Sequence, residues 1–537
     1  MSGRKQTKNF VFIPSSARFA VRARTAIPVC AAVLAAVAAT CAILPMTAIA
    51  AAAPLPCNPK ACIYFGWDTL NLTSKDVYRC RDKFAATGFD GIAVNVEGRA
   101  ADGKGFLARQ VMASHPFTRG EFDEAAPMLR EILATKGLRE SLFMVYWMGT
   151  KKRRIGWVDD AAWAEFAANM RFVCAFAKEM GFKGLFIDHE DYTDMPLFWW
   201  RPSDDPPYAE TVALARRRGA ETARAMAAGD PDVRFVFDRT LMQIKDAVRS
   251  QTPVESSAAQ GALWYPFFNG FLEGMGPRMR HVEGCEEAYE AKTSVDYRAL
   301  IGDCRSVALE VVEPQLRTKY LGQTEMSFGK YLDGWQRNPY YEMHTTIPTT
   351  LFEAGVNCDR MFWVYGEKGS VVDWGAEGRQ RAHATTWSEA FPSLPSILRL
   401  AVGDYSELRA KAASGALTNL VTDIGAKGPD RLEGPVAKRG FRAVLGFKAG
   451  DRVYAAFSAK GDDVAGTVLW ADGRGVRMCA KGCQVLARPS MALADGWNRY
   501  ECVLIVPDGV DGVGVELAAR NAPQATTWFS DISIYKW

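Results

Sequence analysis

The chain has 537 residues, of which 48% are hydrophobic and 23% are charged, so it is long enough to bury a large core and to form two or three domains. Its formal net charge is only +4, and its Lys and Arg residues are scattered rather than arranged in a stripe. This composition gives no electrostatic footprint for nucleic acid, and we expect no nucleic-acid partner.

The first 50 residues have the character of a signal peptide rather than of a folded domain. Basic residues are frequent in residues 1–24, and an Ala-rich apolar stretch follows over residues 26–53. The small residues at 48–50 fit cleavage just after Ala50. An uncleaved anchor is the alternative, because about 20 apolar residues can span a bilayer. After cleavage we expect a secreted, periplasmic or cell-surface protein without stable membrane insertion.

The cysteines permit disulfides in an exported protein. Two of the 12 cysteines lie in the N-terminal segment, which leaves an even number. Only five histidines occur, and none has ligand spacing with a Cys pair, so we expect no metal site and no cofactor. The closely spaced disulfide candidates are Cys57 with Cys62, Cys285 with Cys304, and Cys479 with Cys483.

From residue 61 the chain repeats one pattern, in which a short β-rich apolar run ends in polar or acidic residues and an amphipathic helix follows. Alternation of this kind builds parallel sheets. The helix predicted over residues 160–180, for example, has apolar residues three and four positions apart and stops before Gly181. The strand candidates are residues 63–68, 91–97, 142–147, 184–190, 233–238, 281–289, 320–328 and 360–367.

Eight such units over about 320 residues predict an α/β fold of the (β/α)8 TIM-barrel type with enlarged loops. An open doubly wound sheet is the alternative, but no Gly-rich phosphate-binding loop follows the first strand. Residues 376–416 are predicted to be helical and to close the barrel, so the barrel domain is expected over residues 51–416.

The character of the sequence changes after Asn419. Short alternating runs separated by Gly, Asp and Pro turns predict an all-β sandwich over residues 417–537. The runs NLVTD, WNRYECVLIVPDGVDGVGVEL and TTWFSDISIYKW resemble the galactose-binding-like jelly-roll modules that are appended to polysaccharide-active enzymes. The resemblance implies a jelly-roll domain that either binds carbohydrate or only braces the barrel.

In a TIM barrel the active site lies at the carboxyl ends of the strands, and acidic and aromatic residues fall there in this sequence. Carboxylates hydrogen-bond sugar hydroxyls while aromatic rings stack on apolar sugar faces, so the combination predicts a carbohydrate ligand. Cleavage of a glycosidic bond then needs one protonated and one ionised carboxyl group. The residues expected to bind substrate are Trp67, Asp68, Glu97, Trp147, Tyr192, Trp363 and Tyr365.

The sharpest local motif is FIDHEDY at residues 186–192, at the predicted end of the fourth strand. Residues two apart in a strand point the same way, so Asp188 and Glu190 are expected to share the mouth of the barrel while His189 faces elsewhere. Two acids so close do not both ionise easily, which would raise one pKa towards the range of a general acid. We predict Glu190 as that acid; structural capping or salt bridging is the alternative for both.

This motif resembles the TIM-barrel glycoside hydrolases, in which an acidic residue that ends strand four is the usual proton donor. Asp188 and Glu190 are similar to the end of the chitinase-type motif, although residues 183–185 lack its upstream acids. The segments GWDT, GFDGIAVNVEG, YPFFNGFLEG and FWVYGEKGSVVDWG resemble uncharacterised glycosidases of environmental bacteria. The resemblance implies a secreted glycoside hydrolase of carbohydrate metabolism without naming its substrate.

The identity of the second catalytic carboxylate is open. Glu367 on the eighth strand is the first candidate and Glu287 the second, while Glu325 would suit the usual nucleophile position on the seventh strand. Asp238 lies beside Arg239, which favours a local ion pair.

A binding protein and a different class of hydrolase are the alternatives to a glycoside hydrolase. A non-catalytic glycan-binding barrel of the cell surface would lack a second carboxylate within reach of Glu190. An esterase or deacetylase would need a nucleophile or a metal cluster, and the sequence shows no G-x-S-x-G motif.

Overall fold

The structure is a computed structural model. The N-terminal segment with the predicted signal peptide lies outside the described residues. Among the helices that are described, none has the length and apolar character that crossing a bilayer requires. The structure describes residues 60–66, 72–112, 115–147, 154–191, 196–240, 261–332, 347–366, 369–374, 386–421, 430–433, 438–440, 443–461, 464–478, 481, 483–486, 489–519 and 526–537.

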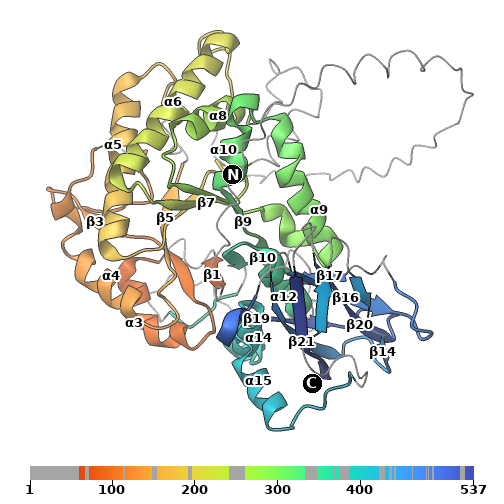
Figure 1. Cartoon of the computed structure of the whole chain (residues 1–537). Coiled ribbons are helices and arrows are strands. Elements are labelled where there is room, and N and C mark those ends of the chain that lie inside the picture. Colours follow the sequence, from red (N-terminus) through yellow and green to blue (C-terminus); the bar gives the residue numbers. More distant parts are fainter. Residues whose placement is uncertain are drawn as a thin grey trace, which may run out of the picture. The chain divides into compact units, whose positions relative to one another are not determined.

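The main element is a curled sheet of nine strands in the order β10-β11-β1-β2-β5-β6-β7-β8-β9 (Figure 1). All neighbouring pairs are parallel. From β1 to β9 the spatial order follows the chain, as repeated strand-helix units require. The strands are β1 (Ala61–Gly66), β2 (Gly91–Val94), β5 (Leu142–Tyr146), β6 (Leu185–Asp188), β7 (Arg234–Phe237), β8 (Arg280–Glu283), β9 (Thr324–Met326), β10 (Gly329–Tyr331) and β11 (Met361–Gly366).

The two ends of this sheet belong to one chain segment, because only Ser327 and Phe328 separate β9 from β10. β9 pairs with β8, whereas β10 pairs with β11, which also pairs with β1. Between them, the Ser327 N–H donates to the Glu283 carbonyl (2.9 Å), and the Phe328 carbonyl accepts from the Trp363 N–H (3.0 Å). The sheet therefore curls round on itself, which is consistent with the predicted TIM-barrel-like fold.

Side chains of each strand alternate between two buried surfaces. On β6, Leu185 and Ile187 belong to the large core cluster that includes the helices, whereas Phe186 belongs to a separate cluster with residues of β1, β5, β7, β8 and β11. That second cluster is the interior of the curled sheet. Because successive strand residues point to opposite sides, Asp188 follows Phe186 and points towards the interior at the carboxyl end of β6.

Helices lie between the strands, and local sequence sets their ends. α5 (Asp160–Met180) starts after Asp159, whose carboxylate accepts a hydrogen bond from the Ala162 N–H (3.0 Å). It stops at Gly181, whose φ of 99° is a conformation that favours glycine. These are the bounds that the periodicity predicted. The other α-helices are α3 (Ser74–Ala85), α4 (Ala125–Ala134), α6 (Tyr208–Gly229), α8 (Trp264–Gly274), α9 (Ser294–Arg305), α10 (Arg317–Gln323), α12 (Ile347–Asn357), α13 (Trp387–Ala390), α14 (Leu394–Ala401) and α15 (Ser406–Ala413).

The predicted strands at residues 281–289 and 320–328 are much shorter than expected. In residues 281–289 the strand ends at Glu283, and a 3-10 helix, η2 (Glu286–Glu290), follows. In residues 320–328 the first four residues belong to α10, and β9 starts only at Thr324. A short buried apolar run has the same pattern in a helix and in a strand, so periodicity could not separate the two. The remaining 3-10 helices are η1 (Arg119–Phe122), η3 (Val307–Glu310), η4 (Pro314–Leu316) and η7 (Ala494–Gly496).

The predicted strand at residues 91–97 also changes course. β2 ends at Val94, and Glu97 begins β3 (Glu97–Arg99), which forms an antiparallel hairpin with β4 (Gly105–Leu107). Glu97 is therefore not at the end of a strand of the curled sheet.

The C-terminal part forms antiparallel sheets, as the alternation after Asn419 predicted; the jelly-roll topology stays a prediction. One sheet has the order β12-β21-β15-β19-β18, and the other has the order β13-β20-β16-β17, with β14 pairing to β20. Apolar side chains from both sheets form one core. The strands are β12 (Asp430–Glu433), β13 (Lys438–Gly440), β14 (Val444–Leu445), β15 (Arg452–Lys460), β16 (Val464–Ala471), β17 (Cys483–Leu486), β18 (Met491–Ala492), β19 (Trp497–Ile505), β20 (Gly512–Ala519) and β21 (Thr526–Lys536).

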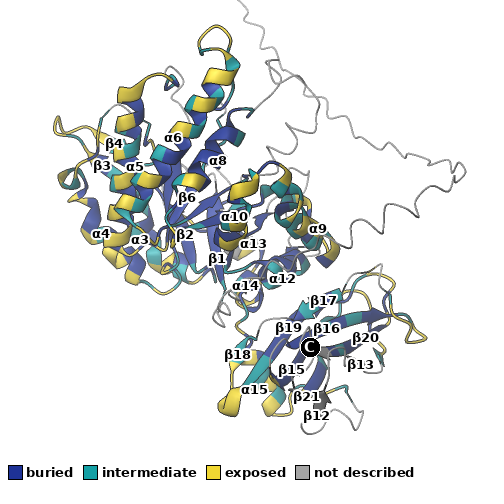
Figure 2. Cartoon of the chain, turned by 45° about the horizontal axis from the view of Figure 1, so that its top comes forward, coloured by how far each residue is buried: buried dark blue, intermediate teal, exposed yellow. Residues whose placement is uncertain are grey.

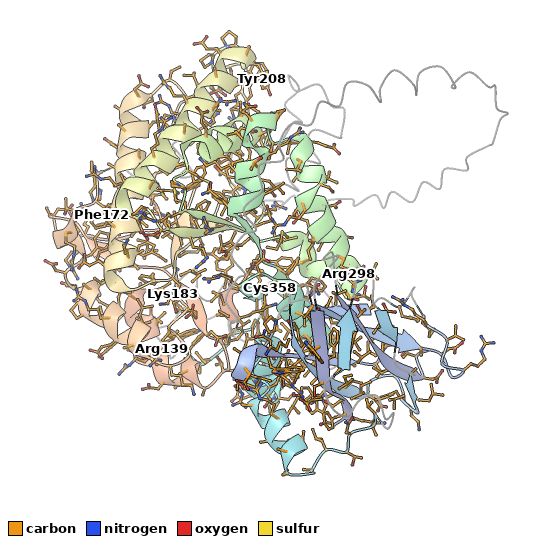
Figure 3. All side chains as sticks on the ribbon, in the orientation of Figure 1. Arg139, Phe172, Lys183, Tyr208, Arg298 and Cys358 are labelled. Atoms are coloured by element: carbon orange, nitrogen blue, oxygen red, sulfur yellow. The ribbon has the colours of Figure 1, made fainter. Side chains whose placement is uncertain are left out.

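Burial follows these layers. Figure 2 shows the strands of the curled sheet largely buried, while exposed residues gather on the outward sides of α4, α5 and α6. In Figure 3, Arg139 and Lys183 mark the chain just before β5 and β6, and Tyr208 marks the start of α6 at the opposite end. The carboxyl ends of the strands therefore lie towards the Tyr208 end of this region.

The cysteine pairings are not seen as disulfides. Cys285 and Cys304 are buried free thiols. Cys62 and Cys483 are also free thiols, and their predicted partners, Cys57 and Cys479, lie outside the described residues.

Candidate active site at the carboxyl ends of β6, β7 and β8

The FIDHEDY motif places two carboxylates at the end of β6. Asp188 is the last residue of the strand, and its Oδ1 accepts a hydrogen bond from the Glu190 N–H (2.9 Å). Asp188, Glu190 and Asp238 each have a carboxylate oxygen within 4.8 Å of the other two. The two-residue spacing predicted that Asp188 and Glu190 lie together; Asp238, at the end of β7, joins them because β6 and β7 are neighbours.

His189 faces away from this pair, as the strand alternation predicted. It is 4% exposed and stacks on Trp264, with ring centroids 4.3 Å apart. Its Nδ1 lies 2.7 Å from Asp238 Oδ1. His189 therefore supports Asp238 from the outer side of the strand ends.

Arg239, which follows β7, connects an acid that follows β6 with an acid that follows β8. Its Nη2 lies 2.5 Å from Glu190 Oε1, and its Nε lies 3.4 Å from Glu286 Oε2. The sequence suggested a local ion pair with Asp238, but these two ion pairs reach beyond β7 to the residues that follow β6 and β8. The guanidinium places one positive charge among the carboxylates.

Gly284 allows the ends of β7 and β8 to approach closely. A Cβ at this position would lie 2.3 Å from the Phe237 carbonyl oxygen, so no larger residue fits without a shift. The Gly284 N–H donates to that same oxygen (2.7 Å), and the Glu286 N–H donates to the Asp238 carbonyl (3.1 Å). These bonds fix Glu286, the first residue of η2, beside the end of β7.

Burial, and then the crowding of carboxyl groups, raises the pKa values of these acids. Burial, with the charges of Asp238 and Glu190, raises the pKa of Asp188 well above its ordinary value. The pKa of Asp238 rises for the same reasons, burial first and Glu190 second. Burial, Glu190 and Asp238 raise the pKa of Glu286 to about 9, although Arg239 opposes the shift. Protonated and ionised carboxyl groups can therefore coexist here near neutral pH.

Aromatic side chains border the acids on the other side of the interior. Tyr289 of η2 and Tyr365 of β11 are both half-buried, and their rings stack with centroids 5.9 Å apart. Trp363 lies deeper, is 2% exposed, and donates from Nε1 to the Gly284 carbonyl (2.8 Å). Tyr146 ends β5, and the Arg109 guanidinium lies over its ring at 4.6 Å. Tyr365 thus lies half-buried near the carboxyl end of β11, whereas Trp363, which was also expected to bind substrate, is buried in the interior of the sheet.

Trp147 does not lie in the mouth, contrary to the sequence expectation. It is fully buried and packs against Phe166, Phe237 and Phe267 in the core cluster outside the sheet. The alternation on β5 explains this, because Tyr146 points to the interior and the next residue must point outward. Trp147 cannot contact a ligand inside the mouth.

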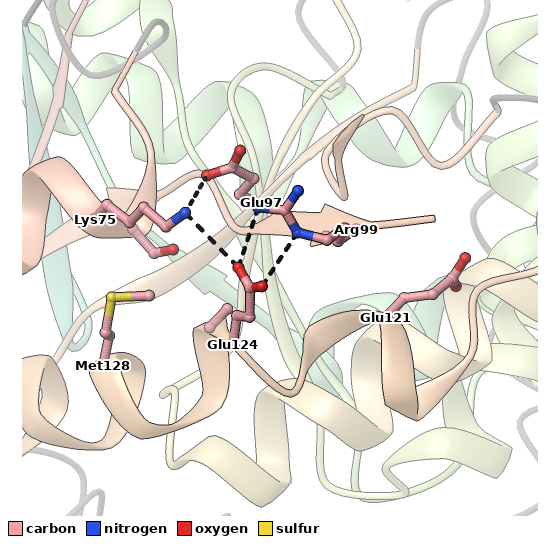
Figure 4. A pocket seen from close by; sticks show the side chains of 9 residues that line it. Lys75, Glu97, Arg99, Glu121, Glu124 and Met128 are labelled. Carbon is pink, nitrogen blue, oxygen red and sulfur yellow. Dashed lines mark hydrogen bonds and ion pairs between the residues drawn. The ribbon is translucent and has the colours of Figure 1, made fainter. Parts of the chain in front are cut away.

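Glu97 lies in a separate hollow between α3, β3 and α4 (Figure 4). Its carboxylate is 3.9 Å from Lys75 Nζ, which is also 3.8 Å from Glu124, and Glu124 is 3.2 Å from Arg99. These charges are partly exposed and paired with one another, as in a surface ion-pair network.

Glu325 lies towards the amino ends of the strands, away from the acid cluster at their carboxyl ends. Its two carboxylate oxygens are 3.0 Å and 3.3 Å from the Nε and Nη2 of Arg234, the first residue of β7. The ion pair uses both carboxylate oxygens and holds the Glu325 side chain near the amino end of β7. Glu325 is therefore not a member of the acid cluster at the carboxyl ends.

Several predicted residues have no described position. Trp67, Asp68, Tyr192 and Glu367 all fall outside the described residues. Glu287 is described and lies on η2 next to Glu286. Sequence reasoning assigned Arg239 only an ion pair with Asp238, and it assigned no role to Tyr289 or Gly284. Arg239 and Gly284 lie within two residues of the ends of β7 and β8, and this position is the signal that could have found them.

Three carboxylates within 4.8 Å could also share a cation, and Asp188, Glu190 and Asp238 are the group among the described residues with that spacing. Arg239 already contacts Glu190 from this cluster, so the chain itself supplies positive charge there.

No family model and no curated protein matches the chain. Among solved structures, a GH5_18 protein from Streptomyces cattleya in complex with GlcNAc is 13% identical, with 66% of this chain and 92% of that chain covered and a TM-score of 0.35. The α-amylase from Geobacillus thermoleovorans complexed with acarbose is 8% identical, with 86% and 99% covered and a TM-score of 0.36. A CBM4 structure is 16% identical, with 19% of this chain and 59% of that chain covered and a TM-score of 0.14. Scores this low carry no argument about function.

Proposed function

We propose that the chain is a carbohydrate-active enzyme, a glycoside hydrolase, with its active site at the carboxyl ends of β6, β7 and β8. The observation that carries this proposal is the convergence of Asp188, Glu190, Asp238 and Glu286 around Arg239. Glycoside cleavage needs one carboxyl group that is protonated and one that is ionised, and this arrangement favours both states.

Glu190 suits the ionised role. Its ion pair with Arg239 at 2.5 Å stabilises a negative charge on Glu190, so this carboxylate would attack the anomeric carbon or activate a water molecule. The sequence favoured Glu190 as the proton donor, but in the structure its carboxylate contacts the Arg239 guanidinium. The contact therefore supports the role of nucleophile or base, rather than that of proton donor, for Glu190.

Glu286 suits the protonated role, because its raised pKa of about 9 keeps a proton available at neutral pH. In the reaction the bond between the anomeric carbon and the leaving oxygen breaks, and the Glu286 proton passes to that oxygen. Asp188 and Asp238, whose pKa values are also raised, would hydrogen-bond sugar hydroxyls. The stacked Tyr289 and Tyr365 rings would border the sugar.

We also propose that the protein is exported by its N-terminal segment and that the antiparallel C-terminal part serves as a galactose-binding-like accessory domain. Trp67, Asp68, Tyr192 and Glu367 are retained as candidate substrate or catalytic residues, and carbohydrate as the partner. The alternative, a glycan-binding barrel without catalysis, is disfavoured because it would lack a second carboxylate near Glu190, whereas Asp188 and Asp238 lie within 4.8 Å.

The test is hydrolysis of a panel of aryl glycosides and of plant, algal and host polysaccharides by the full-length protein. Glu190→Gln and Glu286→Gln are the test variants, and Glu97→Gln, in the separate hollow, is the matched control. We expect wild type and control to cleave at least one substrate, and both test variants to lose activity while retaining sugar binding. Sugar binding without cleavage by wild type would favour the binding protein, and full activity in both test variants would refute the assigned site.

A further inference from the structure

Lys330 of β10 is a buried cation that has no role in the catalytic steps proposed above. The residue is 2% exposed. Its Nζ donates to three backbone carbonyls, those of Ala288 (3.0 Å), Tyr289 (2.9 Å) and Ala291 (2.9 Å). An ammonium group has three N–H donors, so these bonds can use all of them.

The three carbonyls belong to the end of η2 and the residue that caps it. The last carbonyls of a helix have no partner within the helix, and a cation at that end interacts favourably with them. Without the ammonium, the Ala288 carbonyl would keep the Ala291 N–H (3.0 Å), but the Tyr289 and Ala291 carbonyls would lose this donor. A buried acceptor left unsatisfied costs roughly 1–3 kcal/mol. Lys330 therefore fixes where η2 ends.

The start of η2 is fixed independently. Trp363 Nε1 donates to the Gly284 carbonyl (2.8 Å), and the Glu286 N–H donates to the Asp238 carbonyl (3.1 Å). Glu286 lies between these anchors and the Lys330 ammonium, on the first turn of η2. A shift at either end would move its carboxyl group relative to Arg239.

We propose that Lys330 is a positioning residue of the active site, which holds η2 so that the Glu286 carboxyl group faces Arg239 and Glu190. The catalytic consequence rests on the proposed function, whereas the holding of η2 does not.

Lys319 provides a matched control. Its Nζ donates to the carbonyls of Glu273 (3.2 Å) and Met275 (2.6 Å) at the end of α8. The contact is of the same kind, a lysine on the last carbonyls of a helix, but α8 carries none of the clustered acids.

The experiment compares Lys330→Met with Lys319→Met in the full-length protein, by steady-state kinetics on a cleaved substrate of the panel and by hydrogen exchange of residues 284–292. A displaced catalytic group lowers the rate far more than the affinity, so kcat should fall about 10- to 100-fold in K330M with KM within about twofold. Exchange in residues 284–292 should be faster in K330M and unchanged in K319M. Equal kcat and equal exchange in the two variants would overturn the proposal.

Lys330→Gln is the second variant, for the case in which K330M does not fold. It keeps two N–H donors but neither the third donor nor the charge, so the same changes are expected at smaller size. Wild-type kcat and exchange in K330Q would overturn the proposal. If wild type cleaves nothing, the proposed function fails on that result alone, while exchange still decides whether Lys330 holds η2.

Discussion

Buried acids occur in both the parallel and the antiparallel parts of the molecule, but their surroundings differ. In β19 the Glu501 side chain has no exposure and is surrounded by donors. The hydroxyl groups of Tyr454 and Ser490 donate to its two oxygens, and Arg409 Nη1 lies 2.8 Å away. Around Asp188 and Glu286, in contrast, the neighbours of each acid are mainly other acids.

The difference separates a structural acid from a candidate functional one. Glu501 has a donor for each oxygen, which is what a buried charge needs in order to stabilise a fold. Within the described part of the chain, the carboxyl groups at the carboxyl ends of β6, β7 and β8 lie close to one another and two of them contact the Arg239 guanidinium, so the cluster keeps repulsion that folding alone does not require. Perturbed acids of this kind concentrate at functional sites.

The largest expected effect is that of Glu286→Gln on catalysis. Loss of a general acid should lower kcat about 10²- to 10⁴-fold on substrates with a poor leaving group. Because the change also removes a repelled acid, stability should be unchanged or higher, as measured by denaturant unfolding. A variant that is both active and destabilised would place Glu286 with the structural acids.

Arg239→Met should affect activity and stability together. Without the guanidinium, Glu190 and Glu286 lose their shared cation, and we expect a loss of roughly 1.5–3 kcal/mol of unfolding free energy. Activity should also fall, since Glu190 and Glu286 lose the side chain that both of them contact. Unchanged kinetics in folded R239M would remove Arg239 from the site.

Glu501→Gln should show the opposite behaviour to Glu286→Gln. The amide keeps the shape but loses the charge that Arg409 contacts, so unfolding free energy should fall by roughly 1.5–3 kcal/mol. Hydrolysis rates should equal those of wild type under conditions in which both proteins are folded. A loss of activity by the folded variant would contradict the purely structural role.

The pH dependence of stability should sharpen the comparison further. Glu286 has a folded-state pKa of about 9, above its unfolded value, so the folded state holds more protons between the two values. Stability should therefore fall as pH rises from about 4.5 towards 9. Denaturant unfolding across this range should show a shallower decline in Glu286→Gln, and an equally steep decline would mean that Glu286 is not protonated in the fold.

The smallest effect is expected for Glu97→Gln. The ion pair of Glu97 with Lys75 is 3.9 Å long and partly exposed, and pairs of this kind contribute about 0–1 kcal/mol. Unfolding free energy and hydrolysis should both remain close to wild type. A large loss of activity would show that the hollow beside α3 takes part in substrate binding.

Part of the candidate site could be predicted from the sequence, because some of its geometry is local. Asp188 ends β6 and Glu190 follows it by two residues, and this spacing predicted that the two acids lie together. The same alternation, applied to β5, also shows that Trp147 points outward. Glu97 could not be placed in this way, since the hairpin of β3 and β4 turns the chain after β2 ends.

The sequence by itself determined the alternation of strands and helices, the bounds of α5 and the change to antiparallel structure after Asn419, because periodicity and caps act within one element. Only the tertiary structure decided which acids meet. Asp238, Arg239 and Glu286 approach Glu190 through the register of β6, β7 and β8 and the close passage at Gly284. Contacts between strands depend on how separate elements pack, and a local sequence pattern does not predict how close residues of different strands come.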